Sequence, residues 1–256
     1  MNVNPLKNIW DAGNVAIGTY FMYSRDIAAM EVAAAAGLDF VVFDMEHRLQ
    51  DSETIHDLSQ VARLAGVAPL VGPSEISHHA ISHVLDLGAS GVIIPHVETP
   101  EDVALSIEAV HYPPKGKRGR CGVAGHNLYS GRPNVEEIEH YNSDVALLLK
   151  VETEAALRSL EDLVDADGVA GIMIGPLDLS INMGIPGQTG HERILELVEH
   201  ARAVCRKRKI QFGDYVASPD QVANAISTGA GWVIVGSELD ILSGTWKRAK
   251  QEAEKS

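Results

Sequence analysis

The segments VALLLKVE (residues 145–152) and VAGIMIGPLD (residues 169–178) decide the fold class. Each is a short run of aliphatic residues that ends in polar or turn-forming residues, and a longer amphipathic stretch separates the two. Short continuous apolar runs are typical of strands that are buried on both faces of a parallel sheet, with helices as the connections. The two segments therefore predict one strand–helix–strand unit of an α/β protein.

The same unit recurs along the whole chain. Six further runs of this kind lie at residues 15–21, 39–46, 68–74, 91–97, 210–216 and 232–237, which makes eight. Eight strand–helix units in about 250 residues fit a closed (β/α)8 barrel, and we predict one barrel domain over residues 1–256. A doubly wound open sheet is the alternative, but the first run lacks the glycine-rich nucleotide turn expected there.

Turn and capping signals mark the connections. Thr99 before Pro100 predicts a capped helix start, and Ser218 with Gln221 predicts a capping box. One long irregular connection is expected from about residue 112 to 142, and long ordered loops in barrels are often functional or cover a partner subunit.

Composition excludes several classes of protein. The 256 residues are 45% hydrophobic and carry 21 Lys and Arg against 35 Asp and Glu, a formal charge of −14. This charge repels phosphate backbones and anionic lipid, so we expect no nucleic-acid or membrane partner. Cys121 and Cys205 form no C-x-x-C spacing, and no apolar run reaches the roughly 18 residues of a membrane span. We expect a soluble cytoplasmic protein.

Polar residues interrupt the apolar runs at the ends where a barrel carries its chemistry. Asp44, Glu46 and His47 end the second run, and Glu152 and Asp178 end the fifth and sixth. Two carboxylates from adjacent strands favour a hard divalent cation such as Mg²⁺ or Mn²⁺, although each could instead cap a helix. His47 is either a general base or a half-buried residue hydrogen-bonded to Asp44 or Glu46.

Four segments together resemble the HpcH/HpaI aldolase family, and the resemblance covers essentially the whole chain. They are DFVVFDMEHRLQD (39–51), YPPKGKRG (112–119), KVET (150–153) and IGPLDLSINMG (174–184). The resemblance implies a (β/α)8 barrel with an N-terminal helix and a domain-swapped C-terminal helix. It also implies a homohexamer, a trimer of dimers, that acts on a small 2-oxo acid and an aldehyde.

The resemblance implies a metal-dependent lyase. Glu152 and Asp178 match the ligands of Mg²⁺, Mn²⁺ or Co²⁺, and the cation would stabilise the enolate formed when the carbon–carbon bond of a 4-hydroxy-2-oxo acid breaks. His47 would govern proton transfer, and Asp86 of a neighbouring subunit would orient it; with Lys150 and Asp44 these form the predicted catalytic group. The predicted substrate-binding residues are Gly175, Pro176, Ser74, His96 and Arg118.

The third run departs from the family pattern. Family members usually have V-R-P-S there, with an arginine on the keto oxygen, whereas this chain has Gly72 between Val71 and Pro73. Loss of such a donor costs on the order of 100-fold or more in rate unless another group replaces it. Lys150 is a candidate, since strand alternation points it to the same side as Glu152; His96 is the other. A lysine in the barrel also raises Schiff-base chemistry as an alternative.

Three functions follow as hypotheses. The first is the metal-dependent aldolase. The second keeps the site but changes the reaction to a citrate-synthase-like condensation or a 2-oxo acid decarboxylation, because of Gly72 and of Asp214 and Tyr215 near the seventh strand end. The third is a non-catalytic barrel that binds an oxo acid. His126, Tyr129 and Arg132 in the long connection are predicted to form the wall of the second-substrate site, with helix capping or subunit packing as the alternative.

Overall fold

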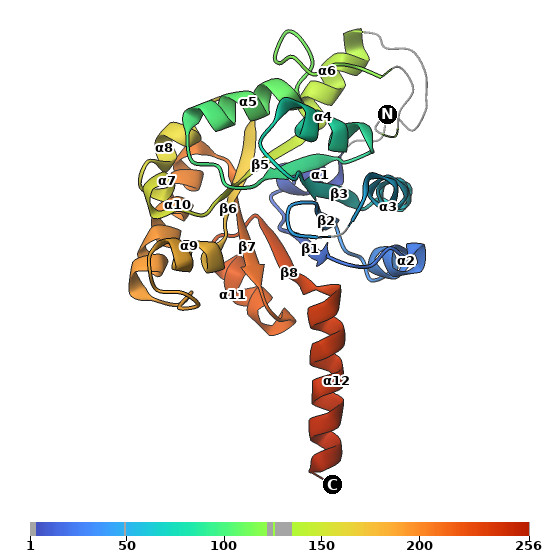
Figure 1. Cartoon of the computed structure of the whole chain (residues 1–256), viewed down its shortest axis with the longest axis vertical. Coiled ribbons are helices and arrows are strands. Elements are labelled where there is room, and N and C mark those ends of the chain that lie inside the picture. The colour runs from blue at the N-terminus through green and yellow to red at the C-terminus, as the bar shows by residue number, and fades with distance from the viewer. Residues whose placement is uncertain (1–3, 49, 122–124, 126–134, 256) are drawn as a thin grey trace.

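The computed structural model describes residues 4–48, 50–121, 125 and 135–255. Eight parallel strands close into a barrel in the order of the sequence, and each predicted apolar run contains one of them (Figure 1). The (β/α)8 prediction is therefore confirmed. The strands are β1 Ala16–Phe21, β2 Phe40–Asp44, β3 Ala68–Gly72, β4 Gly91–Ile94, β5 Ala146–Val151, β6 Val169–Ile174, β7 Gln211–Val216 and β8 Trp232–Ser237.

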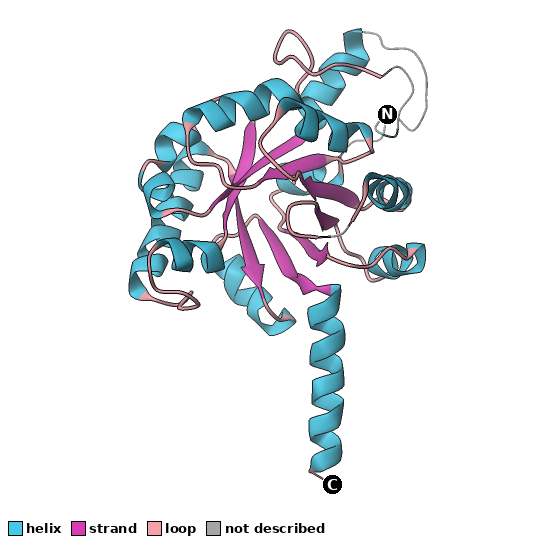
Figure 2. Cartoon of the chain, in the orientation of Figure 1, coloured by secondary structure: helices cyan, strands magenta, loops and turns pink. Residues whose placement is uncertain are grey.

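Helices surround the barrel (Figure 2). Among the described residues, no helix is both long and apolar enough to cross a membrane. The helices are α1 Pro5–Asp11, α2 Ile27–Ala35, α3 Ser52–Leu64, α4 His78–Asp86, α5 Pro100–Val110, α6 Val135–Asp144, α7 Glu154–Arg158, α8 Leu160–Leu163, α9 Pro176–Asn182, α10 Glu192–Arg208, α11 Val222–Ser227 and α12 Glu238–Glu254, with a 3₁₀ turn η2 at Pro219–Gln221.

The core has an outer layer between strands and helices and an inner cluster inside the barrel. Phe40, Leu148 and Trp232 belong to the inner cluster, and none of the three is exposed to solvent. The predicted N-terminal helix is α1, whose Leu6 is fully buried in the same cluster. The Trp10 indole of α1 donates to the carbonyl of Gly231, just before β8 (3.0 Å), so α1 covers the N-terminal end of the barrel.

Successive side chains of β5 point alternately into the two layers of the core. Leu147, Leu149 and Val151 pack in the outer layer, whereas Leu148 lies inside the barrel. Lys150 therefore faces the interior one step closer to the C-terminal end, as the sequence predicts. The barrel interior is apolar at the N-terminal end and polar at its mouth.

Three details differ from the sequence predictions. Asp178 does not end a strand, because Pro176 starts α9 and places Asp178 in its first turn. Thr99 caps α5 as predicted, but Ser218 forms no capping box: the Gln221 side chain accepts instead from the amide of Ala217 (2.9 Å). The long connection ends earlier than residue 142, since α6 begins at residue 135.

The C-terminal helix α12 projects away from the barrel as a single rod (Figure 1). None of its described residues is buried. Large apolar side chains lie open on it: Leu239, Ile241, Leu242 and Trp246, the last 67% exposed. The predicted exchange of this helix with a second subunit stays a prediction.

Candidate active site at the barrel mouth

The turn after β2 is fixed by Asp44, the last residue of that strand. Its Oδ1 accepts hydrogen bonds from the backbone amides of Glu46 (2.8 Å) and His47 (3.1 Å). An Asx turn of this kind reverses the chain immediately after the strand. Asp44 therefore sets the position of Glu46 and His47 at the barrel mouth.

Glu152, directly after β5, is the most deeply buried acid of the site, with 1% of its side chain exposed. Lys150 Nζ forms an ion pair with its Oε1 (2.6 Å) and lies 3.9 Å from Glu46 Oε2. Both side chains face the same cavity because they are two residues apart along the strand. The interior of the barrel mouth thus contains a buried, paired charge.

His96 connects the ends of three strands. It follows β4 with a left-handed backbone (φ 49°), which is uncommon for a residue other than glycine. Its ring lies between two carboxylates, with Nδ1 3.0 Å from Glu152 Oε2 and Nε2 2.6 Å from Glu46 Oε1. Its backbone amide also donates to Glu152 Oε2 (3.3 Å). Strained backbone conformations cluster at functional sites because the surroundings must hold them.

The charges of the site act on one another. Burial raises the pKa of Glu152, and the positive charge of Lys150 only partly opposes this effect. Burial alone would lower the pKa of Lys150, but the carboxylates of Glu152, Glu46 and Asp178 together outweigh it and raise the pKa. Lys150 is therefore an ammonium ion at neutral pH, which argues against its acting as a Schiff-base amine.

Gly175 allows the Glu152 carboxylate to pack against the start of α9. A Cβ atom at position 175 would lie 2.3 Å from Glu152 Oε1, so any side chain there would displace the carboxylate. Asp178, in the first turn of α9, is close enough for its charge to raise the pKa of Glu152. The two predicted metal ligands therefore act on each other electrostatically, although one follows a strand and the other lies on a helix.

A cavity of about 30 Å³ lies below Lys150 in the barrel mouth. Gly72 lines it, and a Cβ atom at this position would meet nothing closer than the carbonyl oxygen of Ile93, at 3.6 Å. Packing therefore does not require a glycine here. The other lining residues are Tyr20, Val42, Phe43, Asp44, Glu46, Ile93 and Pro95.

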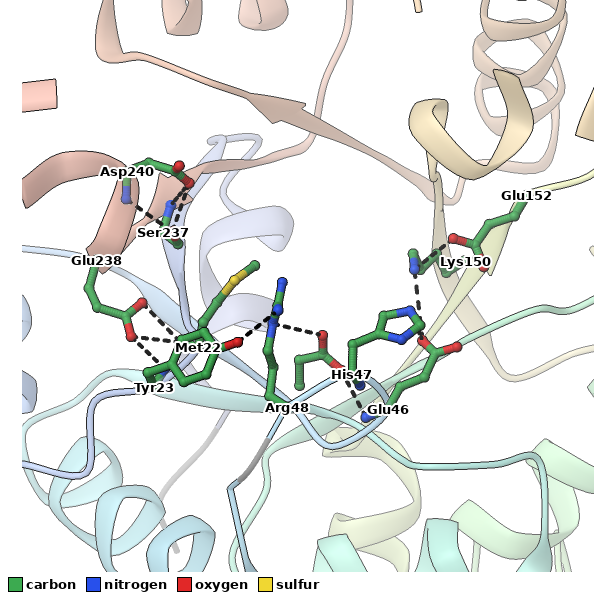
Figure 3. A network of polar contacts seen from close by, with 11 residues as sticks. Met22, Tyr23, Glu46, His47, Arg48, Lys150, Glu152, Ser237, Glu238 and Asp240 are labelled. Carbon is green, nitrogen blue, oxygen red and sulfur yellow. Dashed lines mark hydrogen bonds and ion pairs between the residues drawn. The ribbon is translucent and has the colours of Figure 1, made fainter. Parts of the chain in front are cut away.

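A polar network joins the mouth to the start of α12 (Figure 3). Arg48 Nε lies 4.0 Å from Asp44 Oδ2, and its Nη1 donates to the Tyr23 hydroxyl (3.2 Å). Glu238, the first residue of α12, accepts from the backbone amides of Met22, Tyr23 and Ser24 at 2.6–2.9 Å. The β1 loop is thereby fixed beside the site.

The remaining predicted site residues lie outside this group of contacting side chains. Arg118 is 5% exposed and pairs with Asp86 (2.6 Å), and it lines a cavity of about 360 Å³ with Val67 and Ser90, which directly precede β3 and β4. Arg118 thus lies near the N-terminal end of the barrel, away from the mouth of its own chain, where the sequence predicts that it binds substrate. The assignment of Asp86, which the resemblance gives to the site of a neighbouring subunit, stays a prediction. Ser74 is exposed after β3. His126, Tyr129 and Arg132 lie outside the described residues.

The sequence assigns no role of their own to two residues of the mouth. Glu46, which the sequence places among the polar residues that end the second run, contacts His47 (3.4 Å) and His96 (2.6 Å). Its position between Asp44 and His47 was the available signal. Tyr20 of β1 lines the Gly72 cavity, and burial with the Asp44 and Glu152 charges raises its pKa. A hydroxyl at an inward position of the first apolar run was the signal for Tyr20.

Comparison with known proteins identifies the family of this chain. Residues 19–243 match the family model described as HpcH/HpaI aldolase/citrate lyase. The chain is 32% identical over 243 residues to a pyruvate aldolase of Rhizobium etli, covering 94% of each protein. It is 33% identical over 245 residues to a 2-keto-3-deoxy-L-rhamnonate aldolase of Escherichia coli K12, covering 94% of this chain and 89% of the relative.

Solved structures give the same result. An HpcH/HpaI aldolase from Desulfitobacterium hafniense superposes with a TM-score of 0.91 at 27% identity, over 97% of this chain and 96% of that one. The citrate synthase SbnG superposes with a TM-score of 0.84 at 27% identity, over 97% and 98% of the two chains. The barrel, its acidic mouth and the match over most of the sequence show that this chain belongs to the HpcH/HpaI aldolase/citrate lyase family and is a lyase.

Proposed function

We propose that this chain is a divalent-metal-dependent aldolase for a 4-hydroxy-2-oxo acid. It cleaves the acid to pyruvate or a related 2-oxo acid and an aldehyde, or forms it in the reverse direction. The observation that carries the proposal is the buried Glu152 carboxylate, held between Lys150 and His96 at the barrel mouth. The relationship to two aldolases of 2-oxo acids over 94% of the chain supports the same reaction class.

The donor atoms of the site fit Mg²⁺, Mn²⁺ or Co²⁺. Oε1 of Glu152 is buried, and the Lys150 ammonium, at 2.6 Å, is the group that competes with a cation for it. Carboxylate oxygens are the ligands that these cations prefer. Glu152 and Asp178 would hold the ion, which when bound supplies a Lewis acid for the carboxylate and keto oxygens of the oxo acid.

The side chains of the mouth divide the remaining tasks. In cleavage, the C3–C4 bond of the substrate breaks, its electrons stay on C3 as an enolate, and the C4 hydroxyl loses its proton to leave an aldehyde. C3 then takes up a proton to give the 2-oxo acid. His47, half exposed and 3.4 Å from Glu46, is the base for that proton. The Lys150 ammonium lines the same cavity as Gly72, so it supplies the positive charge at the keto oxygen that an arginine at position 72 supplies in the family.

Substrate contacts complete the proposal. Backbone amides around Gly175 to Asp178, beside Glu152, hold the carboxylate end of the oxo acid, while Pro176, which has no N–H, starts the helix that presents them. His96 and Ser74 border the mouth. Asp86, which pairs with Arg118, contributes through a neighbouring subunit of a homohexamer, in which α12 packs its exposed apolar face on another copy. The assembled enzyme is expected in the cytoplasm, as one domain per chain.

A coupled assay tests the proposal. Chelator-treated protein is given a 4-hydroxy-2-oxo acid with Mg²⁺, Mn²⁺ or Co²⁺, and pyruvate release is followed with lactate dehydrogenase. We expect release that depends on the added cation. If no pyruvate is released with any of the cations, from substrates whose aldehyde portions differ in length, the aldolase proposal is wrong. Borohydride with pyruvate should leave Lys150 unmodified, and a trapped adduct there would replace the metal mechanism by a Schiff base.

Gly72 favours a second candidate, a reaction other than aldol cleavage at the same site. Without an arginine at position 72, the mouth has room beside the keto group, and a citrate synthase is among the structural relatives. Oxaloacetate is the discriminating substrate: its condensation or decarboxylation in the absence of aldol cleavage identifies this reaction. A protein that binds oxo acid but turns over neither substrate is the non-catalytic barrel.

A further inference from the structure

Glu46, His47 and His96 form a cluster of metal-ligating groups on the solvent side of Glu152. Each offers one ligand atom within 4.8 Å of the other two. His96 Nε2 is 2.6 Å from Glu46 Oε1, and His47 Nε2 is 3.4 Å from Glu46 Oε2. Ligands at about 2.0–2.1 Å from a tetrahedral ion are roughly 3.3 Å apart, so small side-chain rotations bring all three into place.

The orientation of His96 is a second observation that points to a metal. Its Nδ1 lies 3.0 Å from Glu152 Oε2, while its Nε2 is directed at the cluster. Histidines that bind a metal through one ring nitrogen commonly donate the other N–H to a carboxylate, which fixes the ring and increases its basicity. Glu152 occupies this outer position, and its contact to the His96 backbone amide (3.3 Å) holds the same geometry.

Charge and access are compatible with an ion at this position. His47 and His96 have 52% and 54% of their side chains exposed, so a hydrated ion can reach them from solvent. Lys150 pairs mainly with Glu152 and lies 3.9 Å from Glu46, which leaves the Glu46 carboxylate available. Two imidazoles and one carboxylate favour borderline cations such as Zn²⁺, Co²⁺ or Ni²⁺ over Mg²⁺.

We propose that Glu46, His47 and His96 form a second divalent-cation site, selective for borderline transition metals, with Glu152 as the outer carboxylate of His96. The site is separate from the oxygen site assigned to Glu152 and Asp178 and does not depend on the aldolase reaction. Because an ion here occupies His47, the base of the proposed reaction, Zn²⁺ at this site inhibits turnover where Mg²⁺ does not.

Cobalt binding in the presence of excess Mg²⁺ tests the site. The chelator-treated full-length protein is dialysed against Co²⁺ with Mg²⁺ in large excess, and bound cobalt is measured by metal analysis and by its visible absorption. We expect one Co²⁺ per chain. His96→Ala and His47→Ala should each weaken binding at least about 100-fold, and Glu152→Gln about 10-fold, as for ligands and an outer-shell partner respectively. His78→Ala, an exposed histidine on α4, is the matched control.

Two results would overturn the second site: no Co²⁺ retained against Mg²⁺, or retained Co²⁺ that Glu152→Gln abolishes while His47→Ala and His96→Ala leave it unchanged. The aldolase proposal can fail independently of the second site. If no pyruvate is released but Co²⁺ binding depends on both histidines, the aldolase proposal falls and the second site stands. If pyruvate is released from the wild type and Zn²⁺ at concentrations that displace the bound Co²⁺ leaves turnover unchanged, that part of the proposal is wrong.

Discussion

The two ends of the barrel interior are built from the same strands but contain opposite kinds of side chain, apolar at one end and charged at the other. Toward the N-terminal end, Leu148 and Trp232 are fully buried among apolar side chains. Toward the mouth, Lys150 and Glu152 place opposite charges where water is largely excluded. Only one residue of β5, Leu149, lies between Leu148 and Lys150. Apolar packing is therefore concentrated at one level of the barrel and charge at the next, and each prediction below tests whether stability and chemistry divide in the same way.

The largest effect on chemistry is expected at Glu152. Glu152→Gln keeps the shape of the side chain but removes the ligand charge, and the loss of a Lewis acid worth several kcal/mol lowers kcat by at least about 1,000-fold. The fold should persist, since burial already disfavours the charged form of Glu152. Steady-state pyruvate release and a thermal melt measure the two quantities. A variant that unfolds would show that the mouth also holds the barrel together.

The largest effect on stability is expected at Trp232. Its ring meets Phe40 edge-on (centroids 5.9 Å apart), and a Cβ atom at Gly213 would lie 2.2 Å from it. Trp232→Ala leaves a cavity in this packing and should cost about 3–5 kcal/mol of unfolding free energy. Denaturant unfolding measures the cost, while kcat per folded molecule stays at the wild-type value. A proportional fall in kcat would mean that the two levels are not separate.

Lys150 tests whether a charge at the mouth replaces the arginine of the family. Lys150→Gln should lower kcat about 100-fold to 1,000-fold, as for the loss of a preorganised donor to a developing oxyanion. Adding Gly72→Arg to this variant should restore part of the rate, because it returns a positive charge to the cavity that residues 72 and 150 both line, and a Cβ atom at position 72 meets nothing closer than 3.6 Å. Unchanged turnover in Lys150→Gln, beside an inactive Glu152→Gln, would contradict the assignment.

The sequence predicts the apolar level better than the polar one, for a physical reason. A continuous aliphatic run such as residues 145–149 specifies a buried strand locally, and alternation then places Lys150 and Glu152 together. The position of His96 depends on a left-handed backbone that no neighbouring residue signals. The sequence places Asp178 at the end of the sixth apolar run. In the structure Pro176 starts α9, so Asp178 lies in the first turn of a helix.

Titration distinguishes the two ends as well. His111 adjoins Gly168, just before β6, and burial lowers its pKa from 6.5 to about 4. The unfolded chain binds a proton at His111 below about pH 6.5, whereas the folded protein binds it only below about pH 4. The stability contributed by the neutral, buried imidazole is therefore fully present above pH 6.5 and is lost as the pH falls toward 4. The loss is on the order of 3 kcal/mol.

The variant that isolates this effect is His111→Gln, whose amide can keep the hydrogen bond to the Ile107 carbonyl (3.0 Å in the wild type). Unfolding free energies measured from pH 7 to pH 4 should fall less steeply in this variant than in the wild type. His78→Gln on the exposed face of α4 should retain the wild-type slope. Equal slopes for all three proteins would show that another group governs acid destabilisation.

The smallest effect is expected at Gly72, where the two levels meet. Its backbone needs no positive φ, and a methyl group there meets nothing closer than 3.6 Å. Gly72→Ala should therefore raise the unfolding free energy slightly, by about 0.4–1 kcal/mol, because alanine restricts the unfolded chain. Gly213→Ala is the matched control and should destabilise, since its methyl group would overlap the Trp232 ring. Because Gly72 contributes nothing to packing, a fall in kcat or a change in oxo-acid preference in Gly72→Ala would mean that the cavity below Lys150 serves the substrate rather than the fold.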